Sequence, residues 1–304
     1  MRPAVNRTSP VFPTIPRGLL KTAWREVQRG RRDGVQPAPR RPDPHRWSGD
    51  GLHAAWLGHS TVLFRIDGFT VLTDPVLGPR CGFKFGAVTL GPKRIVEPAL
   101  EGPEAMPHVD LIVLSHAHLD HFDKPTLRRF ESLNTTIVTA SRTADLLRPK
   151  RWKAVHELGW DESVRVGPLK IRAFKVRHWG ARVQTDTYRG YNGYLLESGR
   201  RRVVFGGDTA YTDTFRALRT HRRVDLAIVP IGAYDPWIHV HCNPEQALAM
   251  ADQSGAEFLL PVHHQTFRLS REGRTEPIER FANAIGADSH RLTVSSVGDQ
   301  WSME

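Results

Sequence analysis

The 304-residue sequence predicts an α/β fold from three observations. Residues 109–114 are rich in Val, Ile and Leu and have the length of a strand that is buried on both faces. Along the chain, a group of strands is followed by strand–helix alternation, and this order then occurs a second time. Apolar residues make up 39% of the chain, which is enough for the core of one large domain.

Strands are expected at residues 52–56, 61–66 and 69–73. The dipeptide Asp67-Gly68 is a hairpin turn signal between the second and the third of them. The following segment, 75–108, contains many Gly and Pro residues and is expected to be a long loop. Such a loop either forms a wall of a substrate cleft or is packed surface without a direct role.

The rest of the chain continues the alternation of strands and helices. Helices are expected at residues 124–133, 141–147, 212–219, 244–254 and 278–285. Strands are expected at residues 135–139, 163–166, 169–176, 191–197, 201–205, 226–230 and 258–262. Asn243 is the expected N-cap of the helix that begins at Pro244, because Asn accepts backbone hydrogen bonds there and Pro fits the first helical position.

The net charge of +11 is unevenly distributed. Residues 1–50 contain 11 Lys/Arg and 4 Asp/Glu, a balance of +7, so residues 51–304 carry only +4. We therefore predict a basic, Pro/Arg-rich N-terminal arm over residues 1–50 and a single domain over residues 51–304. The mild charge of that domain argues against nucleic acid as a partner.

Within the arm, residues 18–32 are expected to form a short helix with an apolar stripe of Leu20, Trp24 and Val27. The stripe is expected to dock on the domain, with peripheral contact to an anionic membrane as the alternative. No apolar run approaches the roughly 20 residues that span a bilayer, and no signal peptide is apparent. Cys81 and Cys242 are too few for a disulfide framework, so we expect a soluble, cytoplasmic protein with two reduced thiols that bind no metal.

A cluster of potential metal ligands follows the buried strand at 109–114. The sequence His116-Ala117-His118-Leu119-Asp120-His121 places three histidines and one aspartate within six residues. Histidine is the commonest metal ligand, and aspartate supplies an oxygen donor to the same cations. Because the C-terminal edge of a parallel sheet is where α/β folds position their ligands, this segment predicts a metal site at that edge.

Three later residues also follow predicted strands and are candidates for the same site. His178 follows the strand at 169–176, Asp208 follows the strand at 201–205 and its two glycines, and His263 follows the strand at 258–262. Their positions bring them to the same sheet edge if the strands are arranged as expected. His264 is the alternative to His263.

These motifs resemble those of the metallo-β-lactamase superfamily of binuclear metal hydrolases. The stretches 56–62, 72–76, 91–94, 206–211 and 230–234 are similar to N-acyl-phosphatidylethanolamine-hydrolysing phospholipase D and its bacterial relatives, and more thinly to ascorbate-6-phosphate lactonases. The resemblance covers about residues 56–285, and the segment 238–241 departs from the phospholipase. It implies an αβ/βα sandwich of two mixed β-sheets with outer helices.

The resemblance also implies a cofactor and a ligand set. Two divalent metal ions are expected, with Zn²⁺ favoured and Fe or Mn as alternatives. Seven residues are expected to bind them: His116, His118 and His178 the first ion, Asp120, His121 and His263 the second, and Asp208 both.

The expected reaction is hydrolysis by a hydroxide held between the two ions. Asp120 is expected to orient the hydroxide, and Asp208 to fix the spacing of the two ions. His241 is expected to bind a substrate oxygen or protonate the leaving group, with the alternative that His239 and His241 are surface histidines. His59 and Asp74 are expected to hold ligands in place. The favoured substrate is a phosphodiester, phospholipid-like or otherwise. The alternatives are a lactonase or other ester or amide hydrolase with weak β-lactamase activity, a nuclease, and a metal-stabilised scaffold without activity.

Overall fold

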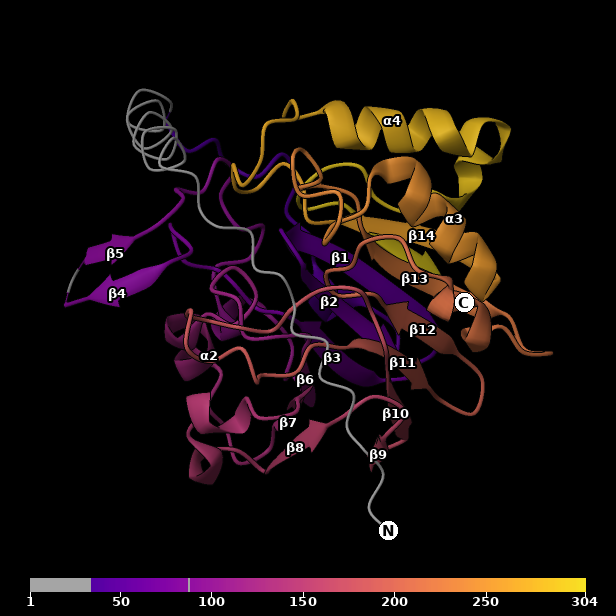
Figure 1. Ribbon diagram of the computed structural model, residues 1–304. Coiled ribbons are helices and arrows are strands. Elements are labelled where there is room, and N and C mark those ends of the chain that lie inside the picture. Colours follow the sequence, from indigo (N-terminus) through magenta and orange to yellow (C-terminus); the bar gives the residue numbers. More distant parts are fainter. Residues whose placement is uncertain (1–33, 87) are drawn as a thin grey trace, which may run out of the picture. The chain divides into compact units, whose positions relative to one another are not determined.

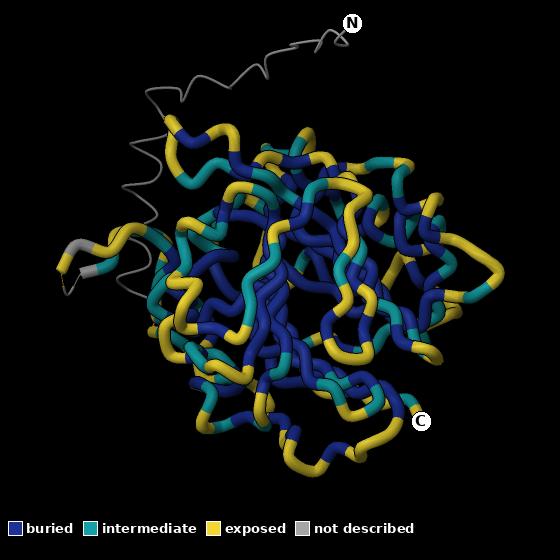
Figure 2. The backbone as a smooth tube through the Cα atoms, turned by 90° about the horizontal axis from the view of Figure 1, so that it is seen from below, coloured by how far each residue is buried: buried dark blue, intermediate teal, exposed yellow. Residues whose placement is uncertain are grey.

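The computed structural model describes residues 34–86 and 88–304, and the fold below belongs to the compact unit Val35–Glu304. The predicted helix at 18–32 lies outside the described residues. Among those residues, no helix is both long and apolar enough to cross a bilayer. Figure 1 shows two β-sheets with helices beside them, and Figure 2 shows that the buried segments lie in the interior, with exposed segments around them.

The first sheet has seven strands in the order β15-β1-β2-β3-β6-β7-β8. Their bounds are β15 Gln300–Met303, β1 Leu52–Gly58, β2 Thr61–Ile66, β3 Phe69–Thr73, β6 Leu111–Leu114, β7 Thr136–Ala140 and β8 Ala154–Leu158. The strands from β15 to β3 pair antiparallel, whereas β3, β6, β7 and β8 run parallel. The carboxyl ends of β3, β6 and β7 therefore lie at one edge.

The second sheet has six strands in the order β14-β13-β12-β11-β10-β9. Their bounds are β14 Ala256–Val262, β13 Val224–Pro230, β12 Arg202–Phe205, β11 Gly193–Glu197, β10 Leu169–Phe174 and β9 Ser163–Val166. Strands β12, β13 and β14 are parallel, and the others pair antiparallel. This sheet is also mixed.

Side chains alternate between the two faces of each strand, so the two faces of the second sheet pack against different apolar clusters. In β13, Leu226 and Ile228 belong to the central core shared with the first sheet, whereas Ala227 and Val229 belong to a second apolar cluster. That cluster includes Phe281 from helix α4 (Glu276–Ile285) and residues of helix α3 (Pro244–Ser254). Because successive side chains of a strand point to opposite faces, both faces of this sheet are buried. The predicted αβ/βα sandwich is confirmed.

Helix α3 begins where its sequence predicts. Asn243 accepts the backbone N–H of Gln246, whose side chain accepts the backbone N–H of Asn243 in return, and Pro244 occupies the first turn. The helix ends at Gly255, which has the left-handed φ of 73° that glycine adopts without strain. This helix follows directly on the segment that carries His241.

Three predicted helices are shorter or of another type. The helix predicted at 124–133 is α2 (Lys124–Arg129), and the segments 141–147 and 212–219 contain only the 3₁₀ turns η3 (Ala144–Leu146) and η5 (Asp213–Leu218). At 141–147, the Glu157 carboxylate accepts the backbone N–H groups of Thr143 and Ala144. These bonds cap the start of η3. The left-handed φ of 60° at Arg142 is incompatible with an α-helix that begins at residue 141.

Other elements were not predicted. They are β8 and β15 at the edges of the first sheet, the hairpin β4 (Phe83–Phe85) and β5 (Val88–Leu90) inside the expected loop 75–108, and the 3₁₀ turns η1 (Pro44–Arg46), η2 (Pro103–Ala105), η4 (Pro149–Arg151) and η6 (Gly286–Arg291). Strand β8 is mostly half-buried and holds a histidine and a glutamate. A half-buried edge strand lacks the continuous apolar run that marks a central one.

Residues 35–50 pack on the domain. Gln36 donates its backbone N–H to Ile95, the Trp47 ring is buried, and the Arg40 guanidinium pairs with Asp299. The compact unit thus begins at Val35, ahead of the boundary predicted at residue 51. The Pro/Arg-rich composition of this stretch does not indicate that the Trp47 ring is buried.

Candidate metal centre

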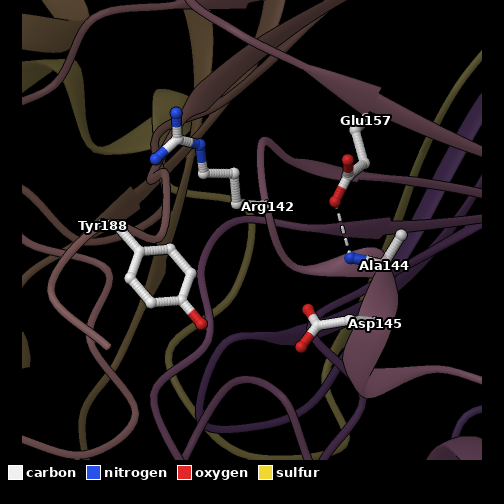
Figure 3. Close-up of a pocket in the computed structure, with 5 residues that line it drawn as sticks. All are labelled: Arg142, Ala144, Asp145, Glu157 and Tyr188. Carbon is white, nitrogen blue, oxygen red and sulfur yellow. Dashed lines mark hydrogen bonds between the residues drawn. The ribbon is translucent and has the colours of Figure 1, made fainter. Parts of the chain in front are cut away.

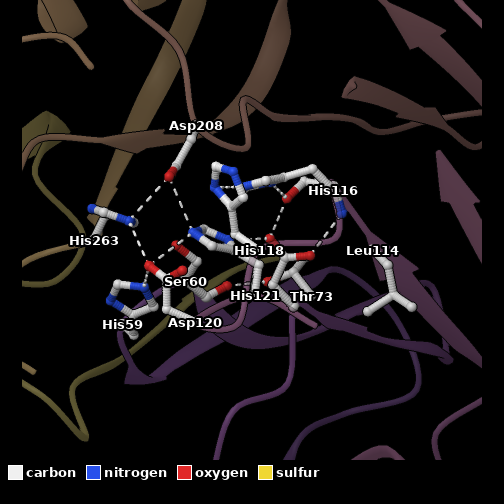
Figure 4. A network of polar contacts seen from close by, with 12 residues as sticks. His59, Ser60, Thr73, Leu114, His116, His118, Asp120, His121, Asp208 and His263 are labelled. Atoms are coloured by element: carbon white, nitrogen blue, oxygen red, sulfur yellow. Dashed lines mark hydrogen bonds and ion pairs between the residues drawn. The ribbon is translucent and has the colours of Figure 1, made fainter. Parts of the chain in front are cut away.

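The seven predicted ligands converge at one edge of the sandwich. Figure 4 labels all of them except His178. His116 follows β6 of the first sheet, whereas His178, Asp208 and His263 follow β10, β12 and β14 of the second. The described residues contain four close groupings of His and Asp side chains, and all of them belong to this one site. Both sheets therefore contribute their strand ends to the same cluster.

The backbone at this edge is unusual. His59, Asp74 and His263 have positive φ angles of 53°, 32° and 65°. Non-glycine residues rarely adopt such angles, and they do so mostly where the surrounding structure holds a functional side chain in place. At Gly207 (φ 57°), an added Cβ would lie 2.8 Å from the Ser115 Cβ, so this glycine allows the segment before Asp208 to pass close to the ligand loop.

The first group consists of His116, His118 and His178. The His118 Nδ1 lies 2.8 Å from the His116 Nε2 and 3.2 Å from the His178 Nε2. All three side chains belong to a set whose candidate ligand atoms lie within 4.8 Å of one another. Burial lowers the pKa of His118 to about 4 and that of His178 well below its usual value, so both rings are neutral at pH 7 and able to bind a cation.

The second group contains Asp120, His121 and His263. The Asp120 carboxylate lies 3.6 Å from the His121 Nε2 and 3.5 Å from the His263 Nε2. Asp208 lies between the two groups: its Oδ2 is 3.1 Å from the Nε2 of both His121 and His263, and 3.8 Å from the His178 Nε2. One carboxylate within reach of both groups is the arrangement expected of a bridging ligand.

Buried polar atoms at this point lack well-aligned hydrogen bonds. Among the described residues they include the Nε2 atoms of His121 and His263 and the Asp208 Oδ1. Such atoms are costly unless another partner satisfies them. Imidazole nitrogen and carboxylate oxygen are donors that zinc, iron and manganese accept, so the residues present fit divalent cations.

Electrostatics also favours cations here. Burial by itself would raise the pKa of Asp208, but His121 and His263 hold it well below its usual value. Conversely, burial would lower the pKa of His263, but the carboxylates of Asp208 and Asp120 raise it to about 9. The two carboxylates are therefore ionised at pH 7, and a bound cation would compete with protons for the imidazoles around them.

Further residues hold the ligands in orientation. The His121 Nδ1 donates to the Asp74 Oδ2 at 2.7 Å, and the Ser115 N–H donates to the other Asp74 oxygen, also at 2.7 Å. The Ser115 hydroxyl also lies 2.8 Å from the His116 Nδ1. Asp74 is thus linked to ligands of both groups. The His59 Nε2 lies 3.1 Å from the Asp120 Oδ2, so it contacts that carboxylate in the expected way.

The role of Asp74 leads to a test. In Asp74→Ala, the buried His121 Nδ1 loses its acceptor and the ring loses its orientation, so we expect about 10- to 100-fold weaker metal binding and a stability loss of about 1–3 kcal/mol. Chelator competition and thermal unfolding measure the two effects. Asp110→Ala is the control, because Asp110 accepts a backbone N–H beside the opposite end of β6. Equal metal affinity in both variants would contradict this role.

His241 also faces the cluster. Its Nδ1 lies 3.8 Å from the Asp208 Oδ2 and has no hydrogen-bond partner, and its ring centroid is 5.1 Å from that of His178. Burial lowers its pKa to about 4. The neighbouring His239 is exposed. Of the two histidines in this segment, only His241 lies where it could reach a group bound at the cluster.

His264 does not join the cluster. Its ring stacks on Trp56 with a centroid distance of 4.4 Å, and burial lowers its pKa to about 3. We therefore expect His263→Phe to lose one bound ion and His264→Phe to keep both, since phenylalanine preserves the stacking. Metal content by elemental analysis distinguishes the two variants. Loss of an ion from His264→Phe alone would reverse the assignment.

A cavity of about 500 Å³ lies elsewhere, beside η3 (Figure 3). Its lining residues are Arg142, Ala144, Asp145, Glu157 and Tyr188. Both carboxylates are already engaged, since Glu157 accepts backbone N–H groups and Asp145 pairs with Arg189. The cavity offers no free set of ligands for a cation. The free thiols of Cys81 and Cys242 are buried and belong to none of the candidate ligand groups of the described chain.

Comparison with known proteins gives the family. Residues 70–264 match the model of the beta-lactamase superfamily domain. An uncharacterised protein of Mycobacterium tuberculosis is 34% identical over 84% of this chain and 69% of its own length. The N-acyl-phosphatidylethanolamine-hydrolyzing phospholipase D 1 of Caenorhabditis elegans is 32% identical over 84% of this chain and 76% of its own length.

A solved structure shows the same fold. Igni18, a metallo hydrolase from Ignicoccus hospitalis, superposes with a TM-score of 0.62 at 19% identity over 83% of this chain and 98% of its own. The family match, the phospholipase relative and the fold agree with the motifs and with the His/Asp cluster. The chain therefore belongs to the metallo-β-lactamase superfamily, within the branch of metal-dependent hydrolases that is similar to N-acyl-phosphatidylethanolamine-hydrolysing phospholipase D.

Proposed function

We propose that this protein hydrolyses a phosphodiester, with a phospholipid-like molecule as the favoured substrate, and that it does so with two divalent cations. The observation that carries the proposal is the position of Asp208, whose Oδ2 lies within 3.8 Å of histidines from both groups. Bound cations would supply Lewis acidity, which lowers the pKa of water towards ~7 and stabilises charge on the attacked group. Zn²⁺ is the favoured ion, with Fe and Mn as alternatives.

The side chains then have distinct roles. His116, His118 and His178 hold one cation, Asp120, His121 and His263 hold the other, and Asp208 fixes their separation. Asp120 is itself oriented by His59, whose Nε2 lies 3.1 Å from its Oδ2, and it would in turn orient the reacting water. His241, whose Nδ1 has no partner, donates a hydrogen bond to a substrate oxygen or a proton to the leaving group.

Two observations favour a substrate with an apolar part. Trp179 packs against both His118 and His178, at centroid distances of 4.5 and 4.4 Å, and is 38% exposed. An aromatic side chain that packs on the site and remains partly exposed offers contact area for an apolar ligand. The similarity to a phospholipase supports the same substrate class.

A substrate panel tests the proposal. The metal-loaded protein is incubated with a chromogenic phosphodiester, an N-acyl-phosphatidylethanolamine, a lactone and a cephalosporin at matched metal content. We expect turnover of both phosphodiesters, its loss with a chelator, and its return when metal is added back. Faster turnover of the lactone would favour the carboxylic-ester reaction instead. No turnover of any substrate by the fully loaded protein would overturn the assignment.

A further inference from the structure

Arg182 links the two sheets' contributions to the metal centre. It lies four residues after His178, on the segment between β10 and β11 of the second sheet. Its Nη1 reaches across to the ligand loop of the first sheet and donates to the Ala117 carbonyl at 3.1 Å and to the Phe122 carbonyl at 2.8 Å. Ala117 lies between His116 and His118, and Phe122 directly follows His121.

These two contacts close the ligand loop. Within the loop, the backbone N–H groups of His121 and Phe122 both donate to the His118 carbonyl, which forms a tight turn. The carbonyls of Ala117 and Phe122 flank that turn, and both residues are fully buried. One cationic nitrogen bonded to both ends of the turn fixes the spacing of the three ligand side chains between them, His118, Asp120 and His121, and it holds the residue that follows His116. Charged donors form the stronger hydrogen bonds.

Arg182 is in turn held by its own segment. The Asp186 carboxylate accepts the Val183 N–H at 2.8 Å and the Arg189 Nε at 2.6 Å, and Arg189 pairs with Asp145 at 2.6 Å. The side chain also lies near the Phe122 ring, with its Cζ 5.9 Å from the centroid. The segment that carries His178 is thus anchored at one end to η3 and at the other to the ligand loop.

We propose that Arg182 is a positioning residue for the metal centre: it holds the His116–His121 loop in register with the His178 segment. The inference rests on the proposed binding of cations at this site. Arg182 touches neither the ligand atoms nor a substrate in this role. Its effect is on the relative placement of ligands from two sheets, to which metal affinity is sensitive because a misplaced ligand loses its bond distance.

Three variants test this role: Arg182→Ala, Arg182→Lys and the control Arg80→Ala. Arg80 is also half-buried and donates to a backbone carbonyl, that of Gly91 at 2.8 Å, but this carbonyl lies outside the ligand segments. For each variant, metal affinity is measured by chelator competition and the visible spectrum is recorded with Co²⁺, whose bands report ligand geometry. Thermal unfolding and circular dichroism report the fold.

We expect about 10- to 100-fold weaker metal binding and an altered Co²⁺ spectrum in Arg182→Ala, partial recovery in Arg182→Lys, and wild-type behaviour in Arg80→Ala. Added guanidinium, well below denaturing concentrations, should restore affinity to Arg182→Ala, since it can occupy the same position. Wild-type affinity in Arg182→Ala, or a loss that guanidinium does not restore, would overturn the inference. In either case the proposed function is judged separately, by the turnover of phosphodiesters by the metal-loaded wild-type protein, and it fails if that protein binds no metal or turns over no substrate.

Discussion

Replacing Asp208 with alanine is expected to lower kcat/KM for a phosphodiester by on the order of 10³-fold or more, because a bridging ligand contributes several kcal/mol of charge stabilisation and positioning. Asp208 is the carboxylate that reaches histidines of both groups. Its loss also leaves His121 and His263 without the negative charge between them. We therefore expect the bound metal to fall from two ions per chain to one or none.

The measurements are metal content after dialysis and initial rates with a chromogenic phosphodiester. Asp213→Ala is the matched control, since Asp213 is a carboxylate on the same segment that accepts hydrogen bonds from the Tyr211 and Gln253 side chains and belongs to none of the candidate ligand groups of the described residues. The control should keep both metal and rate. Unchanged metal content and an unchanged rate in Asp208→Ala would show that activity does not depend on a binuclear site bridged by Asp208.

The location of Asp208 was predictable from the sequence for a simple reason. The apolar strand before it and the two glycines after that strand are local features, and parallel strands bring their carboxyl ends to one edge. The same reasoning placed His178 and His263. All seven predicted ligands lie in the cluster. Strand positions made His178, Asp208 and His263 candidates, whereas the complete ligand set was implied by the resemblance to the metallo-β-lactamase superfamily.

Contacts between distant segments were not predictable in this way. The bonds from Arg182 to Ala117 and Phe122 join loops of different sheets, and neither strand period nor spacing indicates them. The burial of Trp47 was not predictable either. The Pro/Arg-rich composition around it predicted an N-terminal arm, although its ring is buried. The 3₁₀ turn at Ala144 follows Arg142, whose left-handed φ excludes a helix from residue 141, and the Glu157 carboxylate of β8 caps this turn. Local propensity predicts elements, whereas such side-chain contacts decide where they end.

Replacing His241 with alanine is expected to reduce kcat by about 10²-fold, the usual effect of removing one positioned donor from an active site, while both metal ions remain bound. The His241 Nδ1 lies 3.8 Å from the Asp208 Oδ2 but makes no hydrogen bond, so the orientation of that carboxylate does not depend on it. His239→Ala is the control, because that side chain is two residues away and exposed. Loss of metal in His241→Ala would instead make His241 a ligand.

The choice of substrate separates the two roles open to His241. With a phosphodiester that releases p-nitrophenolate, the leaving group needs no proton, whereas an alkoxide leaving group does. If His241 supplies that proton, His241→Ala should slow the alkyl phosphodiester far more than the nitrophenyl one. If it only binds a substrate oxygen, both rates should fall by the same factor, because the lost hydrogen bond is common to the two reactions. Equal rates for His241→Ala and wild type with both substrates would exclude either role.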